Sequence, residues 1–180
     1  MYGYMDNATA TDEANQLAMP DLNAYNYIKG YMHTHPNDYY YTNADGFTIP
    51  KIGIKIFSPT DAIYFMKMLK NAKFTGKPLG GVYGVMVASM NNYQIRFTGT
   101  SAQIKEFTLE QQLQLDDDFA DYMKNKLDTS KKLELGFLYF LETKMNIAGV
   151  NLYRMNANGT TTEIHLNVDK TDTVENNCPI

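Results

Sequence analysis

Short stretches rich in β-branched and aromatic residues alternate along the chain with longer stretches that place an apolar residue every three or four positions. The strand-like stretches are residues 24–33, 47–57, 81–89, 93–98, 150–155 and 161–167, and the helix-like stretches are residues 58–73, 109–127 and 132–147. A period of two is typical of half-buried strands, and a period near 3.6 is typical of amphipathic helices. The mixture predicts an α+β fold in which helices flank a mixed β-sheet.

The first helix-like stretch begins with a clear N-terminal signal. Ser58 suits the N-cap, Pro59 suits the first helical position, and Asp61 falls at the third. The simplest interpretation of Ser58 and Asp61 is a capping box in which Asp replaces the usual Glu or Gln.

Residues 37–57 have the character of an insertion. They contain three consecutive tyrosines at 39–41, a turn-like Asn-Ala-Asp-Gly, and a final stretch in which Ile52, Ile54 and Ile56 alternate with smaller or polar residues. One interpretation is a surface hairpin or edge strand. The other is a lid beside the residues that precede the insertion, in which the tyrosines form a contact surface for a ligand. Long loops often carry function.

The two ends of the chain differ in composition from its middle. Residues 1–22 are acidic and rich in Asn, Thr and Ala, which predicts a flexible, linker-like segment and suggests that Met1 is not the natural start. Residues 23–168 carry the periodic stretches and predict one domain. Residues 169–180 are polar and predict a loose tail.

Composition and charge exclude several classes of protein. A hydrophobic fraction of 44% indicates a globular chain, and a net charge of −4 without a basic cluster argues against a nucleic-acid partner. The single cysteine, Cys178, cannot form an internal disulfide. No apolar run is long enough to span a membrane and no secretory signal begins the chain, which favours a cytoplasmic location unless the chain is a piece of a secreted protein.

Two of the three histidines stand two positions apart, at His33 and His35. Residues i and i+2 of a β-strand face the same side, so both imidazoles would point at one spot. Together with a carboxylate from Asp61 at the mouth of the following helix, they would supply the three protein ligands that catalytic zinc sites use. The sequence therefore predicts a zinc centre made of His33, His35 and Asp61.

Other interpretations of these polar residues remain open. The histidine pair could be solvent-facing or hydrogen-bonded to its neighbours, and Asp38 or Asp45 could replace Asp61 as the ligand if the insertion folds back. His165 is predicted to be an ordinary strand residue. The acidic run at 116–118 is predicted to be a solvated helix face, because it lacks the alternating spacing and the glycine of a calcium loop.

The segment Gly30-Tyr31-Met32-His33-Thr34-His35-Pro36, followed by Ser58-Pro59-Thr60-Asp61, resembles the H-x-H-P … S-x-x-D signature of the JAMM (JAB/MPN) metallopeptidases. The resemblance covers roughly residues 24–100. It implies a cytidine-deaminase-like architecture, zinc held by His33, His35 and Asp61, and support of the oxyanion by Ser58. Two features depart from the family pattern: the gap between His35 and Ser58 is longer, and no clear glutamate motif lies upstream.

The resemblance implies a zinc-dependent hydrolase that cleaves peptide or isopeptide bonds in a peptide or protein substrate through a metal-bound water. Such a reaction needs a proton acceptor, and Glu13 is the only glutamate before His33. Three options are open: Glu13 serves, the natural glutamate lies in a missing N-terminal region, or the domain binds metal without hydrolysis. The alternative functions are a non-catalytic scaffold of this fold and the C-terminal effector module of a larger bacterial secreted or polymorphic-toxin protein.

Overall fold

The computed structural model describes residues 9–10, 15–16 and 19–178. Its helices are α1 (Pro59–Phe74), α2 (Leu109–Met123) and α3 (Ser130–Thr143), with a 3₁₀ turn at Leu79–Gly81. Its strands are β1 (Thr9–Ala10), β2 (Asn15–Gln16), β3 (Gly30–Thr34), β4 (Tyr39–Thr42), β5 (Thr48–Lys51), β6 (Tyr83–Val87), β7 (Asn92–Phe97), β8 (Val150–Met155), β9 (Thr161–Leu166) and β10 (Thr173–Cys178). The predicted α+β class, with helices and a mixed sheet, is confirmed.

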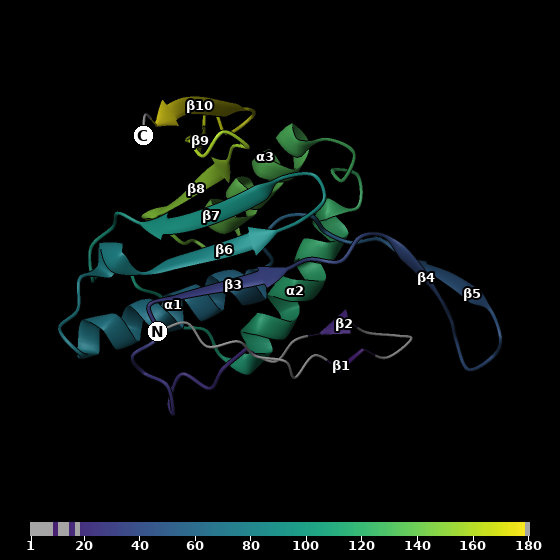
Figure 1. Ribbon diagram of the computed structural model, residues 1–180, viewed down its shortest axis with the longest axis horizontal. Helices are drawn as coiled ribbons and strands as arrows, with labels where there is room; N and C mark the ends of the chain where they lie inside the picture. Colours follow the sequence, from purple (N-terminus) through teal and green to yellow (C-terminus); the bar gives the residue numbers. More distant parts are fainter. Residues whose placement is uncertain (1–8, 11–14, 17–18, 179–180) are drawn as a thin grey trace.

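Six strands form the main sheet in the order β10-β9-β8-β7-β6-β3 (Figure 1). The four pairs from β10 to β6 are antiparallel, and only β3 and β6 run parallel. A parallel pair needs a long crossover, and α1 lies within that connection. The crossover places the N-terminus of α1 next to the carboxyl end of β3, where the histidines lie.

The helices cover the sheet and complete one hydrophobic core. α1 packs against β6 and α2, and α3 packs against β9 and β10 (Figure 1). The largest fully buried side chains include Phe57, Phe65, Tyr93, Phe119, Phe137 and Phe140. Burying an aromatic or aliphatic side chain of this size contributes about 1.5–3 kcal/mol each, so this layer fixes how α1 sits on the sheet.

A tyrosine links the parallel strand pair to α1. Tyr31 of β3 lies opposite Gly84 of β6, and a Cβ atom at Gly84 would come within 2.6 Å of the Tyr31 ring. The glycine therefore leaves room for the buried tyrosine, whose hydroxyl donates to the Asp61 carbonyl at 3.2 Å. This contact ties the strand that carries the histidines to the first turn of α1.

Two predicted strands differ from the structure. The strand predicted at 24–33 begins only at Gly30, because residues 22–27 form turns around Asp21, whose carbonyl accepts from Ala24 and Tyr25. The alternating stretch 52–57 lies in no strand ladder, because its chain turns inward and buries Ile56 and Phe57 in the core.

The predicted loose tail contains a strand. Residues 173–178 form β10, which pairs with β9 over six positions. Polar side-chain contacts hold this end of the chain in place: Glu175 contacts Arg154, Asn177 contacts Thr162, and Asp172 contacts Lys131. Within the predicted linker, the described residues include β1 and β2, which pair with each other.

Candidate metal centre

The capping box at the start of α1 is present. The Ser58 hydroxyl accepts from the Asp61 N–H at 3.2 Å, and the Asp61 Oδ2 atom accepts from the Ser58 N–H at 2.7 Å. The Ser58 hydroxyl also donates to Asp61 Oδ2 at 2.8 Å. These bonds turn the Asp61 carboxylate back toward the helix mouth and fix its orientation.

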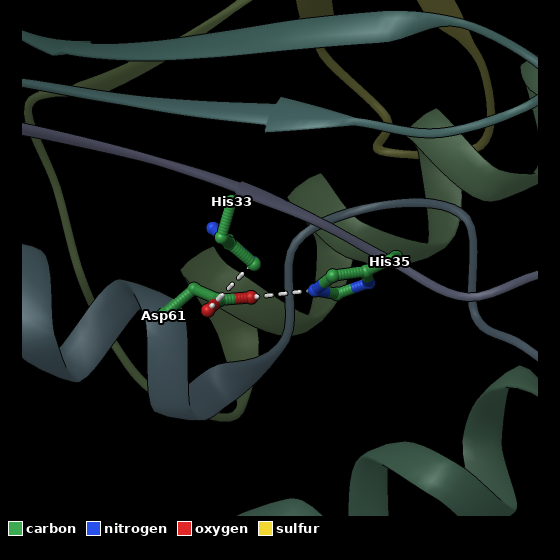
Figure 2. A group of neighbouring side chains, drawn as sticks. All are labelled: His33, His35 and Asp61. Carbon is green, nitrogen blue, oxygen red and sulfur yellow. Dashed lines mark ion pairs between the residues drawn. The ribbon is translucent and has the colours of Figure 1, made fainter. Parts of the chain in front are cut away.

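The same carboxylate faces both histidines (Figure 2). His33 Nε2 lies 3.2 Å from Asp61 Oδ1, and His35 Nε2 lies 3.3 Å from Asp61 Oδ2. One ligand atom from each of the three residues falls within 4.8 Å of the others. The spacing-based prediction that these side chains converge is confirmed.

A backbone carbonyl selects the tautomer of His35. Its Nδ1 atom lies 2.7 Å from the Ile54 carbonyl oxygen, which can only accept, so Nδ1 carries the proton and donates. Nε2 is then free to face Asp61. Burial alone would lower the pKa of His35, but the contacts with Asp61 and the Ile54 carbonyl outweigh it and raise this pKa above its usual value. Metal-ligating histidines commonly donate their second nitrogen to a carbonyl in this way.

His33 stands in contrast, because neither ring nitrogen has a hydrogen-bond partner although both atoms are buried. Its Nε2 is close to Asp61, but the contact is not aligned as a hydrogen bond. Buried polar atoms without partners are rare in proteins and need an explanation, such as an ion.

The donor set fits a divalent metal such as zinc. His33 Nε2 faces Oδ1 of the Asp61 carboxylate and His35 Nε2 faces Oδ2, so the two imidazoles approach different oxygens of the same side chain. Two imidazoles and one carboxylate are also a ligand set that zinc accepts in catalytic centres.

The carboxylate is held in its charged form. Burial on its own would raise the pKa of Asp61, but the contacts with His33 and His35 outweigh burial and hold the pKa well below its usual range. A divalent cation binds the ionised carboxylate, so this environment prepares Asp61 to act as a ligand at neutral pH.

The insertion supports the centre through its neck, which consists of residues 36–38 and 53–55. Asp38 Oδ1 accepts from the Gly53 N–H at 3.0 Å and from the Lys55 ammonium at 2.8 Å. The two chain segments are so close that a Cβ atom at Gly53 would lie 2.1 Å from the Pro36 carbonyl oxygen. The neck therefore fixes the position of Ile54, whose carbonyl orients His35. Beyond it, the β4–β5 hairpin extends away from the sheet (Figure 1).

A carboxylate that sequence reasoning missed packs against the first turn of α1. Asp116 of α2 accepts from the Thr60 N–H at 3.2 Å and from the Thr60 hydroxyl at 2.6 Å. Burial raises the pKa of Asp116 most, the bonds from Thr60 lower it, and the negative charge of Asp61 raises it, with a net increase. The prediction of a solvated face is therefore wrong for Asp116, although Asp117 and Asp118 are exposed.

The remaining predicted residues lie elsewhere. Asp38 belongs to the neck, Asp45 is exposed near the tip of the hairpin, and His165 is a partly buried residue of β9. Glu13 lies outside the described residues. Ser58 is part of the capping box, and its support of an oxyanion stays a prediction.

Two further features of the described residues concern the rest of the molecule. A cavity of about 310 Å³ lies on another side of α1 and is lined by Asp21, Leu22, Asn23, Ile63, Lys67, Lys70, Asn71, Lys105, Glu106 and Phe107, so it contains none of the three ligands. Among the helices described, none combines the length and apolar character needed to cross a membrane.

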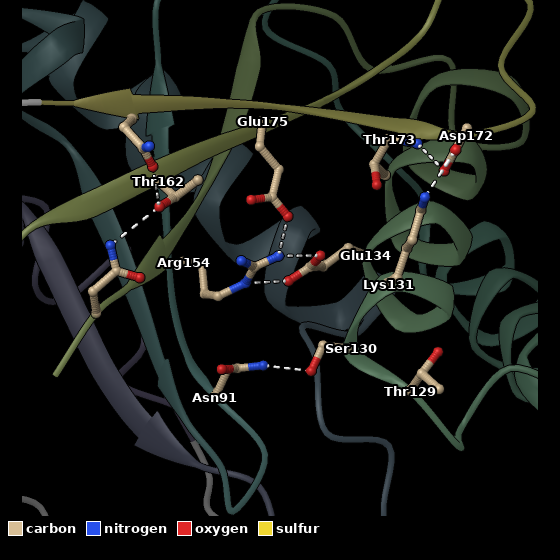
Figure 3. A network of polar contacts seen from close by, with 12 residues as sticks. Asn91, Thr129, Ser130, Lys131, Glu134, Arg154, Thr162, Asp172, Thr173 and Glu175 are labelled. Carbon is tan, nitrogen blue, oxygen red and sulfur yellow. Dashed lines mark hydrogen bonds and ion pairs between the residues drawn. The ribbon is translucent and has the colours of Figure 1, made fainter.

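A second buried polar cluster joins α3 to the sheet (Figure 3). Glu134 is fully buried and receives two bonds from the Arg154 guanidinium, at 2.8 and 2.7 Å. The Tyr93 hydroxyl donates to the same carboxylate at 2.9 Å, and Arg154 also contacts Glu175. Nothing in the sequence pattern indicated this cluster, because its members are far apart along the chain.

Comparisons with known proteins add no family to this picture. No protein-family model, no curated protein and no solved structure matches the chain.

Proposed function

We propose that this domain is a zinc-dependent metallopeptidase-like hydrolase that acts on peptide or isopeptide bonds, with a JAMM/MPN-like arrangement of its metal ligands. The observation that carries the proposal is the convergence of His33, His35 and Asp61, with both nitrogens of His33 buried and without a hydrogen bond. A cluster built for structure alone would satisfy those nitrogens, since unpaired buried groups destabilise the fold.

The chain's own residues would divide the work as follows. His33, His35 and Asp61 hold the ion, and the Ile54 carbonyl keeps His35 in the tautomer that presents Nε2. Zinc, when bound, activates water and polarises the carbonyl that is attacked. The Ser58 hydroxyl has a single proton, which it donates to Asp61, so stabilising an oxyanion would require it to leave that carboxylate.

Two carboxylates are candidates for the proton acceptor. Glu13 is the one that the sequence indicates, and Asp116 is the one that packs against the first turn of α1. Glu13→Gln and Asp116→Asn, made separately, distinguish them. The acceptor is the residue whose loss abolishes turnover while zinc content is kept, because an amide cannot accept and return a proton.

The second candidate function is a metal-binding domain without hydrolysis, either a scaffold or the effector module of a larger secreted protein. One observation favours it: within the part of the chain that the structure describes, the metal-ligating group contains His33, His35 and Asp61 and no further carboxylate. If the wild type takes up zinc and hydrolyses nothing, this second function is the better one; if both amide variants hydrolyse as an active wild type does, neither Glu13 nor Asp116 is the acceptor.

The first test is metal content. The purified chain should take up about one zinc ion, and His33→Ala and Asp61→Ala should each lower that uptake sharply. His165→Ala is the matched control, because it removes the third histidine from a strand far from the centre in sequence. Elemental analysis that finds equal zinc in wild type and in a His33→Ala/His35→Ala double variant would refute the proposal.

A further inference from the structure

β3 is the last strand of the main sheet on the side of the metal centre (Figure 1). Its contacts with β6 begin at the Lys29 carbonyl, which accepts from Tyr83, and end at the His35 N–H, which donates to the Val87 carbonyl. In a strand the two backbone groups of one residue face the same side, and successive residues alternate. The odd-numbered residues therefore bond β6, and Gly30, Met32 and Thr34 turn their N–H and C=O groups outward.

These outward groups have no backbone partner in the part of the chain that the structure describes. No strand among the described residues pairs with the outer side of β3, and no described hydrogen bond reaches the backbone of Gly30, Met32 or Thr34 there. The Met32 side chain, which lies on the face of the sheet opposite Tyr31 and His33, is 72% exposed. Such an edge is a template for another extended chain.

The free edge of β3 lies next to the candidate metal centre. Thr34 stands between His33 and His35, so its outward backbone groups lie between the two residues that hold the ion. The imidazoles lie on the face of the sheet that carries Tyr31, which is the face against α1. A chain paired with β3 would therefore lie in the plane of the sheet, directly beside the strand that carries His33.

We propose that the outer edge of β3 binds an extended peptide as an added strand, and that this pairing brings the peptide to the His33–His35–Asp61 centre. The inference rests on the proposed function and adds the form of its substrate: an unfolded segment read through its backbone. Strand addition gives affinity through main-chain hydrogen bonds, while pockets for alternate side chains give sequence preference.

A second copy of the chain fits this edge less well. Only three residues of β3 face outward, and a stable dimer needs a buried area of about 1,200–2,000 Å² in total. A short peptide needs only these few backbone bonds, and a substrate has to leave after the reaction. The small edge is therefore suited to a transient peptide partner.

The experiment removes one outward donor without touching the contacts with β6. Met32→Pro deletes the outward N–H, and proline is tolerated on an edge strand where its nitrogen faces solvent. Met32→Ala keeps that N–H and removes the side chain, so it is the matched control. Zinc-free wild type and both variants are immobilised and exposed to a library of random-sequence decapeptides, and the captured peptides are quantified by mass spectrometry. We expect capture by Met32→Pro to fall about tenfold, and capture by Met32→Ala to stay within about threefold of wild type.

A second arm leaves the protein unchanged, so it remains decisive if Met32→Pro fails to fold. The same library with every peptide nitrogen methylated lacks backbone donors, and we expect the wild type to capture about tenfold less of it. Equal capture of the two libraries would overturn the proposal, and so would capture by folded Met32→Pro equal to that of wild type. Self-association of wild type that Met32→Pro abolishes, without peptide capture, would also overturn it and assign the edge to a second copy.

Zinc uptake separates this inference from the function on which it rests. If the protein binds one zinc ion but captures no peptides, the metal centre is supported and the proposal about the β3 edge is refuted. If the protein captures peptides through β3 but takes up no zinc, the proposal about the edge is supported and the proposed zinc-dependent hydrolase is refuted. Met32→Pro should keep wild-type zinc content, because the ligand side chains point away from the altered edge.

Discussion

The two buried polar clusters of this domain are built on opposite principles. In the Glu134–Arg154 cluster, every charged group faces a partner, and one carboxylate receives the guanidinium and the Tyr93 hydroxyl together. In the His33–His35–Asp61 cluster, His35 is held on both sides, while both nitrogens of His33 lack a hydrogen bond. The first cluster is complete within the chain, and the second is complete only with something added.

The difference separates a structural contact from a candidate site. A satisfied buried pair offers nothing to a ligand, and breaking it leaves a charge stranded in the core. An unsatisfied cluster lowers the stability of the free protein in exchange for a prepared binding geometry. The two clusters should therefore respond in opposite ways to mutation.

The largest effect is expected when the complete cluster is broken. Glu134→Ala leaves Arg154 and the Tyr93 hydroxyl without their shared partner. It should lower the free energy of unfolding by about 3 kcal/mol. This is the lower end of the range for a buried ion pair, because the Arg154 side chain is 20% exposed. Zinc uptake should not change. Denaturant unfolding measures the cost. Glu142→Ala is the control, since it removes a surface pair with Lys170 from the same helix and should cost less than about 1 kcal/mol. Equal costs would mean that the complete cluster is not structural.

The incomplete cluster should show the reverse. His33→Phe replaces the imidazole by an apolar ring and removes only its unaligned contact with Asp61, so the metal-free protein should lose much less stability than Glu134→Ala loses. Zinc affinity should fall by more than about 100-fold, because losing a mere supporting partner already costs about 10- to 100-fold. Titration with zinc and unfolding of the chelated protein measure both quantities. A loss of metal-free stability comparable to that of Glu134→Ala would contradict the contrast between the two clusters.

A smaller effect should come from the neck of the insertion. Asp38→Ala removes the acceptor that holds Gly53 and Lys55, and so loosens the Ile54 carbonyl that orients His35. Affinity for Co²⁺, a spectroscopic substitute for zinc, should fall about tenfold with a changed visible absorption spectrum. Asp45→Ala near the hairpin tip is the control and should leave the spectrum unaltered. A spectrum identical to wild type in Asp38→Ala would show that the neck does not position the ligand.

The smallest effect is a pH dependence of metal-free stability that comes from Asp61 and His35. The pKa of Asp61 is lowered in the fold, so its contribution is present above its unfolded pKa near 4 and is lost as pH falls through the folded value. The pKa of His35 is raised, so its contribution is present below about 6.5 and is lost as pH rises through the folded value.

Metal-free wild type should therefore gain most over Asp61→Asn between about pH 4 and pH 6.5, as measured by unfolding at a series of pH values. Above that window protons leave His35, and zinc affinity should rise because the metal and the proton compete for the same nitrogen. Suppose that, without metal, the stability difference between wild type and Asp61→Asn grows steadily from pH 6.5 to pH 9. The sign of the pH dependence would then be the opposite of the expected one, and this linkage would be refuted.

Local sequence determined much of the fold and the ligand set. The helix predicted at 58–73 is Pro59–Phe74, and the strand predicted at 150–155 is β8 with the same bounds. Their signals are local: a cap followed by a 3.6 period, and β-branched or aromatic residues between turns. The period of two around the histidine pair and the capping box at Ser58 are local signals as well, but the meeting of Asp61 with His33 and His35 depends on the crossover that sets α1 beside β3.

Only the tertiary structure decided how those ligands are supported and where a substrate could lie. The Ile54 carbonyl is 19 residues from His35, Asp116 is 56 residues from Thr60, and Arg154 is 20 residues from Glu134. Such pairs leave no periodic signal, because their contact depends on how α1, α2 and α3 pack on the sheet. The free edge of β3 is of the same kind: a strand's sequence shows its two faces, but which of its edges lacks a neighbour follows only from the order of strands in the sheet.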